Sequence, residues 1–159
     1  MDVTTYEAWL DSVSSEFTDD PLWRMEVYRL GVFASDLAWH DVSKLMKDRR
    51  TLRIADQLYR AVGSIGANIS EGYSRRSGRD QARFYEYALG SAREARGWYR
   101  QARHVLSENV TTHRIRLLTQ IIRLLMKIIP AKRGSRLREG EASYTVDIGD
   151  LLNNPPMPT

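Results

Sequence analysis

A seven-residue repeat of small and large side chains runs through residues 78–107 and constrains the fold more than any other feature of the chain. Its members are Phe84, Ala88, Ser91, Ala95, Trp98, Ala102 and Val105, so the spacing alternates between four and three residues. This period places all seven side chains along one stripe of an α-helix, which is typical of helices that pack side by side. The sequence therefore predicts a long helix over 78–107, whose small residues let a neighbouring helix approach closely.

Three further stretches show helical periodicity. They cover residues 21–47, 52–73 and 111–129. Asp20 followed by Pro21 is a typical helix start, and Gly72 and Pro130 are typical of helix ends. No strand pattern interrupts these stretches. Four helices joined by short loops predict an all-α fold, an antiparallel up-down-up-down four-helix bundle.

The two ends of the chain differ from the predicted bundle, which covers residues 21–130. Residues 1–20 carry apolar side chains at helical spacing and six acidic residues, which predicts an acidic extension that is helical when docked. We expect it either to lie across the basic bundle or to pack on a neighbouring subunit through Trp9, Leu10 and Phe17. Residues 131–159 are rich in Gly, Pro and Asn and predict a largely irregular tail, with a short extended segment at 144–148.

The helix predicted over 111–129 has an unusually wide apolar stripe. One row consists of Ile115, Leu118, Ile122, Leu125 and Ile129, and the row beside it of Leu117, Ile121, Leu124 and Ile128. An apolar arc of about 100° suffices for a helix in a monomeric bundle. The surplus predicts burial against a second subunit.

Composition excludes several kinds of function. The chain has no cysteine, which removes disulfides, thiolate metal sites and cysteine nucleophiles. No apolar run is long enough to span a membrane, and the acidic N-terminus does not resemble a signal peptide. His40, His104 and His113 lie on separate predicted elements and form no metal-ligand pair. We expect a cytoplasmic protein with no metal, no cofactor and no contact with a membrane.

Charge is distributed very unevenly along the chain. Residues 21–138 contain all 24 Lys and Arg residues but only ten of the 20 acidic residues, an excess of 14 positive charges in a chain of net charge +4. An excess of this size attracts polyanions and makes their binding depend on salt. Twenty of the basic residues are arginine, which binds phosphate bidentately. A well-solvated helical surface is the alternative explanation.

Two arginine clusters are the candidate nucleic-acid contacts. The tip cluster, at the predicted hairpin between the second and third helices, consists of Arg75, Arg76, Arg79 and Arg83. The arginine stripe, along the third helix, consists of Arg93, Arg96, Arg100 and Arg103, with Tyr99 nearby for base stacking. The tip cluster could instead satisfy carbonyl groups at the end of the second helix.

A polar row on the second helix is the nearest approach to a catalytic group. Ser64, Asn68 and Glu71 lie at i, i+4 and i+7, and the hairpin brings Asp80 and Gln81 to a similar level. A metal-dependent nuclease would need a second carboxylate close by. We favour a structural role, in which this row lies on the inner side of the bundle and Glu71 accepts hydrogen bonds from the following turn.

The same helix carries a family signature. Residues 57–72 read Gln-Leu-Tyr-Arg, then Ser-Ile, then Asn-Ile-Ser-Glu-Gly, followed by Arg83-Phe84 and by a Gly-Ser-x-x-Glu at residues 90–94. The sequence resembles the four-helix-bundle proteins encoded in 23S ribosomal RNA intervening sequences, in which Ala is usual where Ser70 stands. The matching positions are Gln57, Arg60, Ser64, Asn68, Glu71, Gly72, Ser91 and Glu94.

The resemblance implies a ring-shaped homo-oligomer, commonly a pentamer, without established enzymatic activity. It also implies kinship with accessory bundle proteins of reverse transcriptases in diversity-generating retroelements. We therefore expect a non-enzymatic, oligomeric bundle that binds RNA or DNA through its arginines and assists a nucleic-acid-processing protein such as a polymerase. The alternative is a protein–protein interaction scaffold with no direct role in nucleic-acid binding.

Overall fold

The computed structural model describes residues 5–134 and 149–159 of the chain, and these residues are helical with no β-strand. The helices are α1 (Tyr6–Ser12), α2 (Ser15–Thr18), the 3-10 helix η1 (Pro21–Arg24), α3 (Glu26–Leu45), α4 (Leu52–Tyr73), α5 (Gly78–Ala102), α6 (Glu108–Lys132) and α7 (Gly149–Leu152). The predicted all-α class is confirmed.

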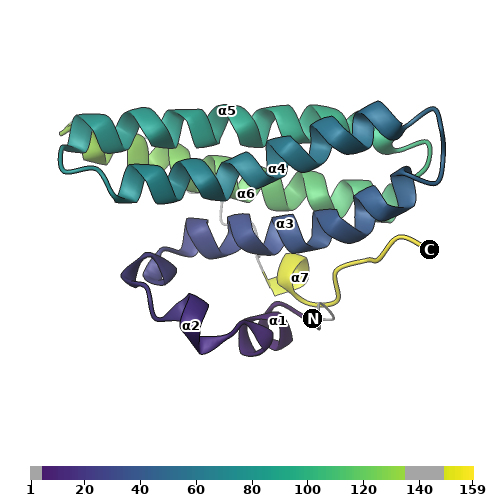
Figure 1. Ribbon diagram of the computed structural model, residues 1–159, viewed down its shortest axis with the longest axis horizontal. Helices are drawn as coiled ribbons and strands as arrows, with labels where there is room; N and C mark the ends of the chain where they lie inside the picture. Colours follow the sequence, from purple (N-terminus) through teal and green to yellow (C-terminus); the bar gives the residue numbers. More distant parts are fainter. Residues whose placement is uncertain (1–4, 135–148) are drawn as a thin grey trace.

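The four long helices, α3 to α6, form the body of the molecule. Each packs against the next along the chain, and α6 also contacts α3. Their short connections reverse the chain each time, so successive helices run antiparallel (Figure 1). Their facing sides bury one continuous apolar core, which holds the exposed side chains of α4 and α5 on a rigid support.

The predicted start of the first long helix was wrong. The Asp20 side chain does accept a hydrogen bond, from the backbone N–H of Leu22 at 2.8 Å, but it caps the short 3-10 helix η1. Met25 then adopts an extended conformation, and α3 begins at Glu26 and ends at Leu45, within the predicted range 21–47. The bounds predicted for α4 are confirmed.

The connection between α5 and α6 also differs from the prediction. Helix α5 ends at Ala102 instead of residue 107, and α6 begins at Glu108 instead of residue 111. Ser107 is the N-cap of α6: it is extended, and its side chain accepts a hydrogen bond from the backbone N–H of Val110. Helix α6 then passes through Pro130 to Lys132. Pro130 lacks a backbone donor and crowds the carbonyl four residues earlier, but the helix continues for only two residues beyond it, and the neighbouring Ile129 is buried in the core.

The buried stripe of α5 is displaced from the predicted one. The small residues Ala88, Ala95 and Ala102 are buried as expected. Phe84, Ser91, Trp98 and Val105 are only partly buried, and the large side chains between the alanines are instead Tyr85, Tyr99 and Leu106, with Ala92 in the same row. Both rows obey a seven-residue repeat, and packing in three dimensions selects the one offset by a single residue.

The wide apolar stripe of α6 is largely buried within the chain itself. Leu117, Leu118, Ile121, Ile122, Leu125 and Ile129 are all buried, and Ile115, Leu124 and Ile128 pack partly against the same core. The stripe therefore does not require a second subunit, contrary to the argument from its width.

Both ends of the described chain pack beside α3. Trp9 of α1 is fully buried, contacts the ring of Phe33 and donates a hydrogen bond from Nε1 to Asp36 Oδ2 at 2.7 Å. The C-terminal segment 149–159 runs past the N-terminal one, and Thr5 and Asn153 form an isolated antiparallel bridge (Figure 1). The extended segment predicted at 144–148 lies outside the described residues.

Within the described residues, no helix has the length and apolar character required to cross a bilayer. The same residues hold no group of three or more histidine and carboxylate side chains placed to bind a metal ion.

Candidate nucleic-acid interface

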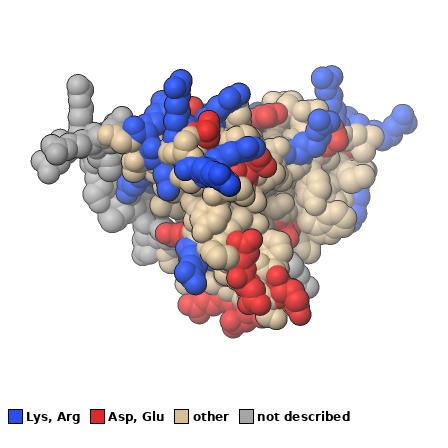
Figure 2. All heavy atoms as spheres, turned by 60° about the vertical axis from the view of Figure 1, so that its left-hand side comes forward, with Lys and Arg blue, Asp and Glu red and all other residues tan. Residues whose placement is uncertain are grey.

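Acidic and basic side chains occupy different parts of the surface. Figure 2 shows acidic side chains gathered at the lower edge, where Figure 1 places α1 and α2, and basic side chains over the long helices above. The exposed acids of the N-terminal segment are Glu7, Asp11, Glu16, Asp19 and Asp20. This segment packs on α3 of its own chain, so in this structure it neither covers the two arginine clusters nor offers Trp9 to a neighbour.

The tip cluster surrounds the connection between α4 and α5. Ser77 is the N-cap of α5, and its Oγ accepts a hydrogen bond from the backbone N–H of Asp80 at 3.1 Å. Arg79 and Arg83 follow one turn apart, and both are exposed, as are Arg75 and Arg76. The cap thus fixes where the arginines emerge from the helix.

The end of α6 adds cations to this cluster. Gly78 lies so close to the carbonyl of Lys132 that a side chain there would collide with the backbone, which shows how tightly the two helix ends meet. As a result Arg79, Arg83 and Arg133 line one surface hollow of about 600 Å³, together with Ser77, Asp80 and Glu86. Glu86 pairs with Arg133 at 2.5 Å, whereas Arg79 and Arg83 form no ion pair with an acidic residue among the described part of the chain.

Two adjoining aromatic rings, each in contact with an arginine, lie beside this hollow. The guanidinium of Arg75 lies 4.7 Å from the centre of the Phe84 ring, and Phe84 meets Tyr87 edge to face at 5.7 Å. The guanidinium of Arg83 lies 5.7 Å from the centre of the Tyr87 ring, and Arg83 Nε donates a hydrogen bond to Tyr87 Oη at 2.8 Å. We call these four residues the arginine–aromatic ladder. Sequence analysis missed it, because Phe84 was assigned to the core.

The arginine stripe lies farther along α5. Arg93, Arg100 and Arg103 are exposed, and Arg100 and Arg103 line a second hollow of about 540 Å³ against α6. Arg96 is half-buried, and its Nε has no hydrogen-bond partner within residues 5–134 and 149–159. Arg83 and Arg93 are ten residues apart, which is about 15 Å along a helix. The eight predicted arginines therefore form two separate surfaces.

The prediction that Tyr99 stacks on a base beside the arginine stripe was wrong. It is 1% exposed and donates a hydrogen bond from Oη to Asp41 Oδ2 at 2.8 Å. A ring in this position cannot stack on a base. The prediction failed because Tyr99 belongs to the buried row of α5.

The family-signature residues of α4 do not line the inside of the molecule. Arg60 and Glu71 are exposed, and Gln57, Ser64 and Asn68 are half-buried. Asn68 donates only to the carbonyl of Ser64 in its own helix, at 2.8 Å, rather than bridging to another helix. Glu71 pairs with Arg75, as expected for a contact with the following turn. The predicted inner polar row is therefore an outer one, because only every third or fourth position of α4 meets the core.

The remaining signature positions have local roles. Gly72 is buried where a side chain would meet the Tyr85 ring at 2.7 Å. Ser91 donates to the carbonyl of Tyr87 at 3.0 Å, and Glu94 accepts from Trp98 Nε1 at 3.2 Å. These contacts stay within α5 or at its packing surface against α4, and none assembles a catalytic group.

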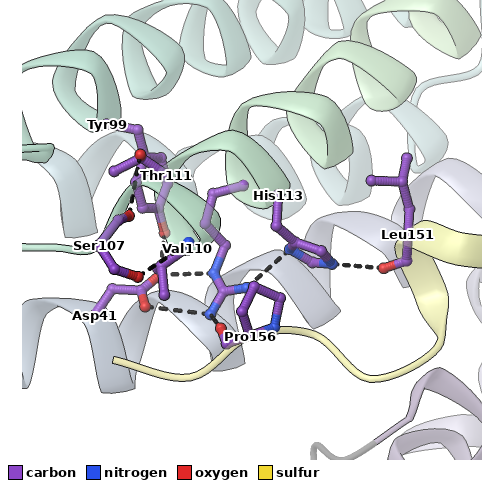
Figure 3. Close-up of polar contacts among 9 residues, drawn as sticks. Asp41, Tyr99, Ser107, Val110, Thr111, His113, Leu151 and Pro156 are labelled. Carbon is purple, nitrogen blue, oxygen red and sulfur yellow. Dashed lines mark hydrogen bonds and ion pairs between the residues drawn. The ribbon is translucent and has the colours of Figure 1, made fainter. Parts of the chain in front are cut away.

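A buried ionic network, which sequence analysis also missed, lies between α3 and α6 (Figure 3). Arg114 is 1% exposed and Asp41 is fully buried. Arg114 donates to Asp41 from Nε at 2.8 Å and from Nη2 at 3.2 Å, and Nη2 also donates to the carbonyl of Pro156 at 2.9 Å. The Asp41 carboxylate thus accepts hydrogen bonds from three donor atoms, Nε and Nη2 of Arg114 and Oη of Tyr99. Because it is buried and its charge is paired, we infer that the network has a structural role. No local pattern signals it, since Asp41 and Arg114 are 73 residues apart.

His113 extends the network to the C-terminal segment. Its Nε2 lies 2.6 Å from the carbonyl oxygen of Leu151, and its Nδ1 lies 2.8 Å from Arg114 Nη1. A carbonyl can only accept and a guanidinium can only donate, so the ring is neutral with its proton on Nε2. Burial, together with the positive charge of Arg114, lowers the pKa of His113 from 6.5 to about 4.

Comparison with known proteins agrees with the all-helical fold and the motifs of α4 and α5. A crystal structure of a protein of unknown function from the S23 ribosomal protein family of Bacteroides thetaiotaomicron VPI-5482 superimposes with a TM-score of 0.61. The two sequences are 23% identical over 65% of this chain and 97% of that one. No match was found among curated proteins. The family described as 23S rRNA-intervening sequence protein matches residues 24–127, which include both arginine clusters, and the chain therefore belongs to that family.

Proposed function

We propose that this protein is a non-enzymatic nucleic-acid-binding protein that contacts phosphate groups through the arginines of α5 and the adjoining helix ends. The observation that carries the proposal is the set of exposed arginines without acidic partners. Among the described residues, Arg76, Arg79, Arg83, Arg93, Arg100 and Arg103 are all exposed and none forms an ion pair. Guanidinium groups in this state are available to phosphate oxygens.

Recognition of this kind reads the backbone of the nucleic acid rather than its base sequence. Arginines that protrude from a helix surface reach phosphates, whereas base readout requires side chains that enter a groove. Non-specific binding of this type has dissociation constants of about 10⁻⁴ to 10⁻⁶ M at physiological salt. The acidic N-terminal segment lies away from these arginines, so the protein would present one side to the polyanion.

The test is the salt dependence of binding to structured RNA, single-stranded RNA and duplex DNA, measured by fluorescence anisotropy. Protein freed of co-purified nucleic acid is compared with the variant R76S/R79S/R83S. Loss of three phosphate contacts should weaken binding and reduce the slope of log K against log salt by about 2 for a single strand. Absence of binding at low salt would refute the proposal.

A matched control distinguishes the effect of the tip arginines from the effect of the protein's overall net charge. The variant R49S/R53S/R60S removes the same charge from three exposed arginines of the α3–α4 connection and the first half of α4. It should retain most of the affinity. Equal losses from both variants would mean that the net charge of the protein, rather than the tip cluster, attracts the nucleic acid.

A second candidate function, a scaffold for protein contacts, is favoured by exposed apolar side chains at α3 and α4. Trp39 is 59% exposed and Met46 is 62% exposed, and the Trp39 ring meets that of Tyr59 at 6.0 Å. We propose that copies of the chain, each an up-down-up-down four-helix bundle, associate through this surface into a ring-shaped oligomer, such as a pentamer. Linked subunits would sum weak phosphate contacts. Light scattering should report a mass several times 18.4 kDa, and W39S/M46S should reduce it.

A further inference from the structure

We propose that the arginine–aromatic ladder binds unpaired bases, so that the tip of α4 and α5 recognises single-stranded rather than duplex nucleic acid. The inference rests on the proposed function and names the class of substrate for one of its two surfaces. It depends on the rings beside the tip cluster, which the charge argument does not use.

The first step is that the rings are accessible. Tyr87 is 46% exposed and Tyr73, at the end of α4, is 40% exposed, although large aromatic side chains normally bury most of their surface. Tyr73 is the last residue of α4, two positions before Arg75, and Tyr87 lies one turn after Arg83 on α5 and contacts it. Exposed rings among cations are the combination that single-strand binding proteins use, because every base offers a flat face for stacking.

The second step is that the ladder holds its members in place. Tyr87 is held by its edge-to-face contact with Phe84 and by the hydrogen bond that its Oη accepts from Arg83 Nε. Arg75 is held over Phe84 and paired with Glu71. A ring that is already ordered loses little conformational entropy when a base stacks on it.

The third step is that a phosphate site adjoins the rings. Arg83 belongs both to the ladder and to the hollow that it lines with Arg79 and Arg133. A strand whose phosphate lies in this hollow has its neighbouring base within reach of Tyr87. A duplex can supply the phosphate but not the base, because its bases are already stacked and paired.

The experiment compares a short unstructured RNA, the DNA of the same sequence, and the RNA annealed to its complement. The variant Y87L removes the ring but keeps an apolar side chain. Stacking contributes about 1–3 kcal/mol per base, so we expect affinity for both single strands to fall by about 5-fold to 150-fold, and affinity for the duplex to stay the same. Y87F keeps the ring but loses the hydrogen bond with Arg83, so it should retain most of the single-strand affinity that Y87L loses.

A matched control is F17L, which removes an aromatic ring of 47% exposure from α2, in the acidic segment that lies away from the tip. It should leave binding to all three probes unchanged. An equal loss of single-strand and duplex binding in Y87L would overturn the inference, since the ring would then only position Arg83. A wild-type preference for the duplex would overturn it as well. Both results leave the proposed function intact, whereas absence of binding to every probe refutes both.

Discussion

The neutral His113 predicts a specific dependence of stability on pH. The side chain is 7% exposed, and its folded pKa of about 4 lies well below the ordinary value of 6.5. Between these two values the unfolded chain binds a proton that the folded chain does not, so the free energy of unfolding falls as the pH falls. Above pH 6.5 the effect vanishes, because His113 is neutral in both states.

The magnitude follows from the size of the shift. Each unit of pKa difference corresponds to about 1.36 kcal/mol, so lowering the pH from 7 to 5 should cost about 2 kcal/mol through His113 alone. The limit, reached well below pH 4, is about 3 kcal/mol. These values are large compared with a typical total stability of about 5–15 kcal/mol.

The assay is urea unfolding followed by circular dichroism at pH 7 and pH 5, with His113→Gln as the reference. Glutamine does not titrate, so the variant should show a loss smaller by about 2 kcal/mol between the two pH values, even though its stability at pH 7 is lower. All other groups are the same in the two proteins, so their contributions cancel in the comparison. Identical losses in the two proteins would refute the argument, as would a directly titrated His113 pKa near 6.5.

Two further predictions concern packing and hydrogen bonding. Gly72→Ala should destabilise the protein by about 1–3 kcal/mol, because the added methyl group would lie 2.7 Å from the Tyr85 ring. Gly90→Ala, at a helical position where nothing lies within 4 Å, should instead be neutral or stabilising by up to about 1 kcal/mol in the same denaturation assay. Tyr99→Phe removes one donor to the buried carboxylate of Asp41 and should cost about 1–3 kcal/mol. An unchanged midpoint for Tyr99→Phe would show that the carboxylate is satisfied without it.

The sequence predicted the helices well where local signals define them. Helix α4 has the predicted bounds, and α5 begins at the predicted residue 78. Periodicity alone could not choose between two seven-residue rows of α5 that differ by one position, and this ambiguity misplaced Phe84 and Tyr99. The choice depends on how α4 and α6 pack on α5, which is information that no single helix carries.

The candidate site was predictable in composition but not in arrangement. The tip arginines and their exposure followed from the hairpin between α4 and α5. The position of Arg133 in the same hollow could not be predicted, because it depends on where α6 ends. The helix was expected to end at Pro130 but continues to Lys132. The ion pair of Asp41 and Arg114 joins residues that are 73 positions apart. The pattern of charge along the sequence therefore does not indicate that these two residues are buried together.

That network also has a consequence for folding kinetics. The contacts between α4 and α5 and between α5 and α6 join residues close in sequence and should form early, because they need little loop closure. The pairing of Asp41 with Arg114 closes a loop of more than seventy residues. The hydrogen bonds of His113 to the carbonyl of Leu151 and of Arg114 to that of Pro156 require the C-terminal segment to dock as well. Interactions that form after the transition state govern the unfolding rate. Substitutions in this network should therefore accelerate unfolding while leaving the refolding rate nearly unchanged, which makes it the part of the molecule that sets how long the folded state persists.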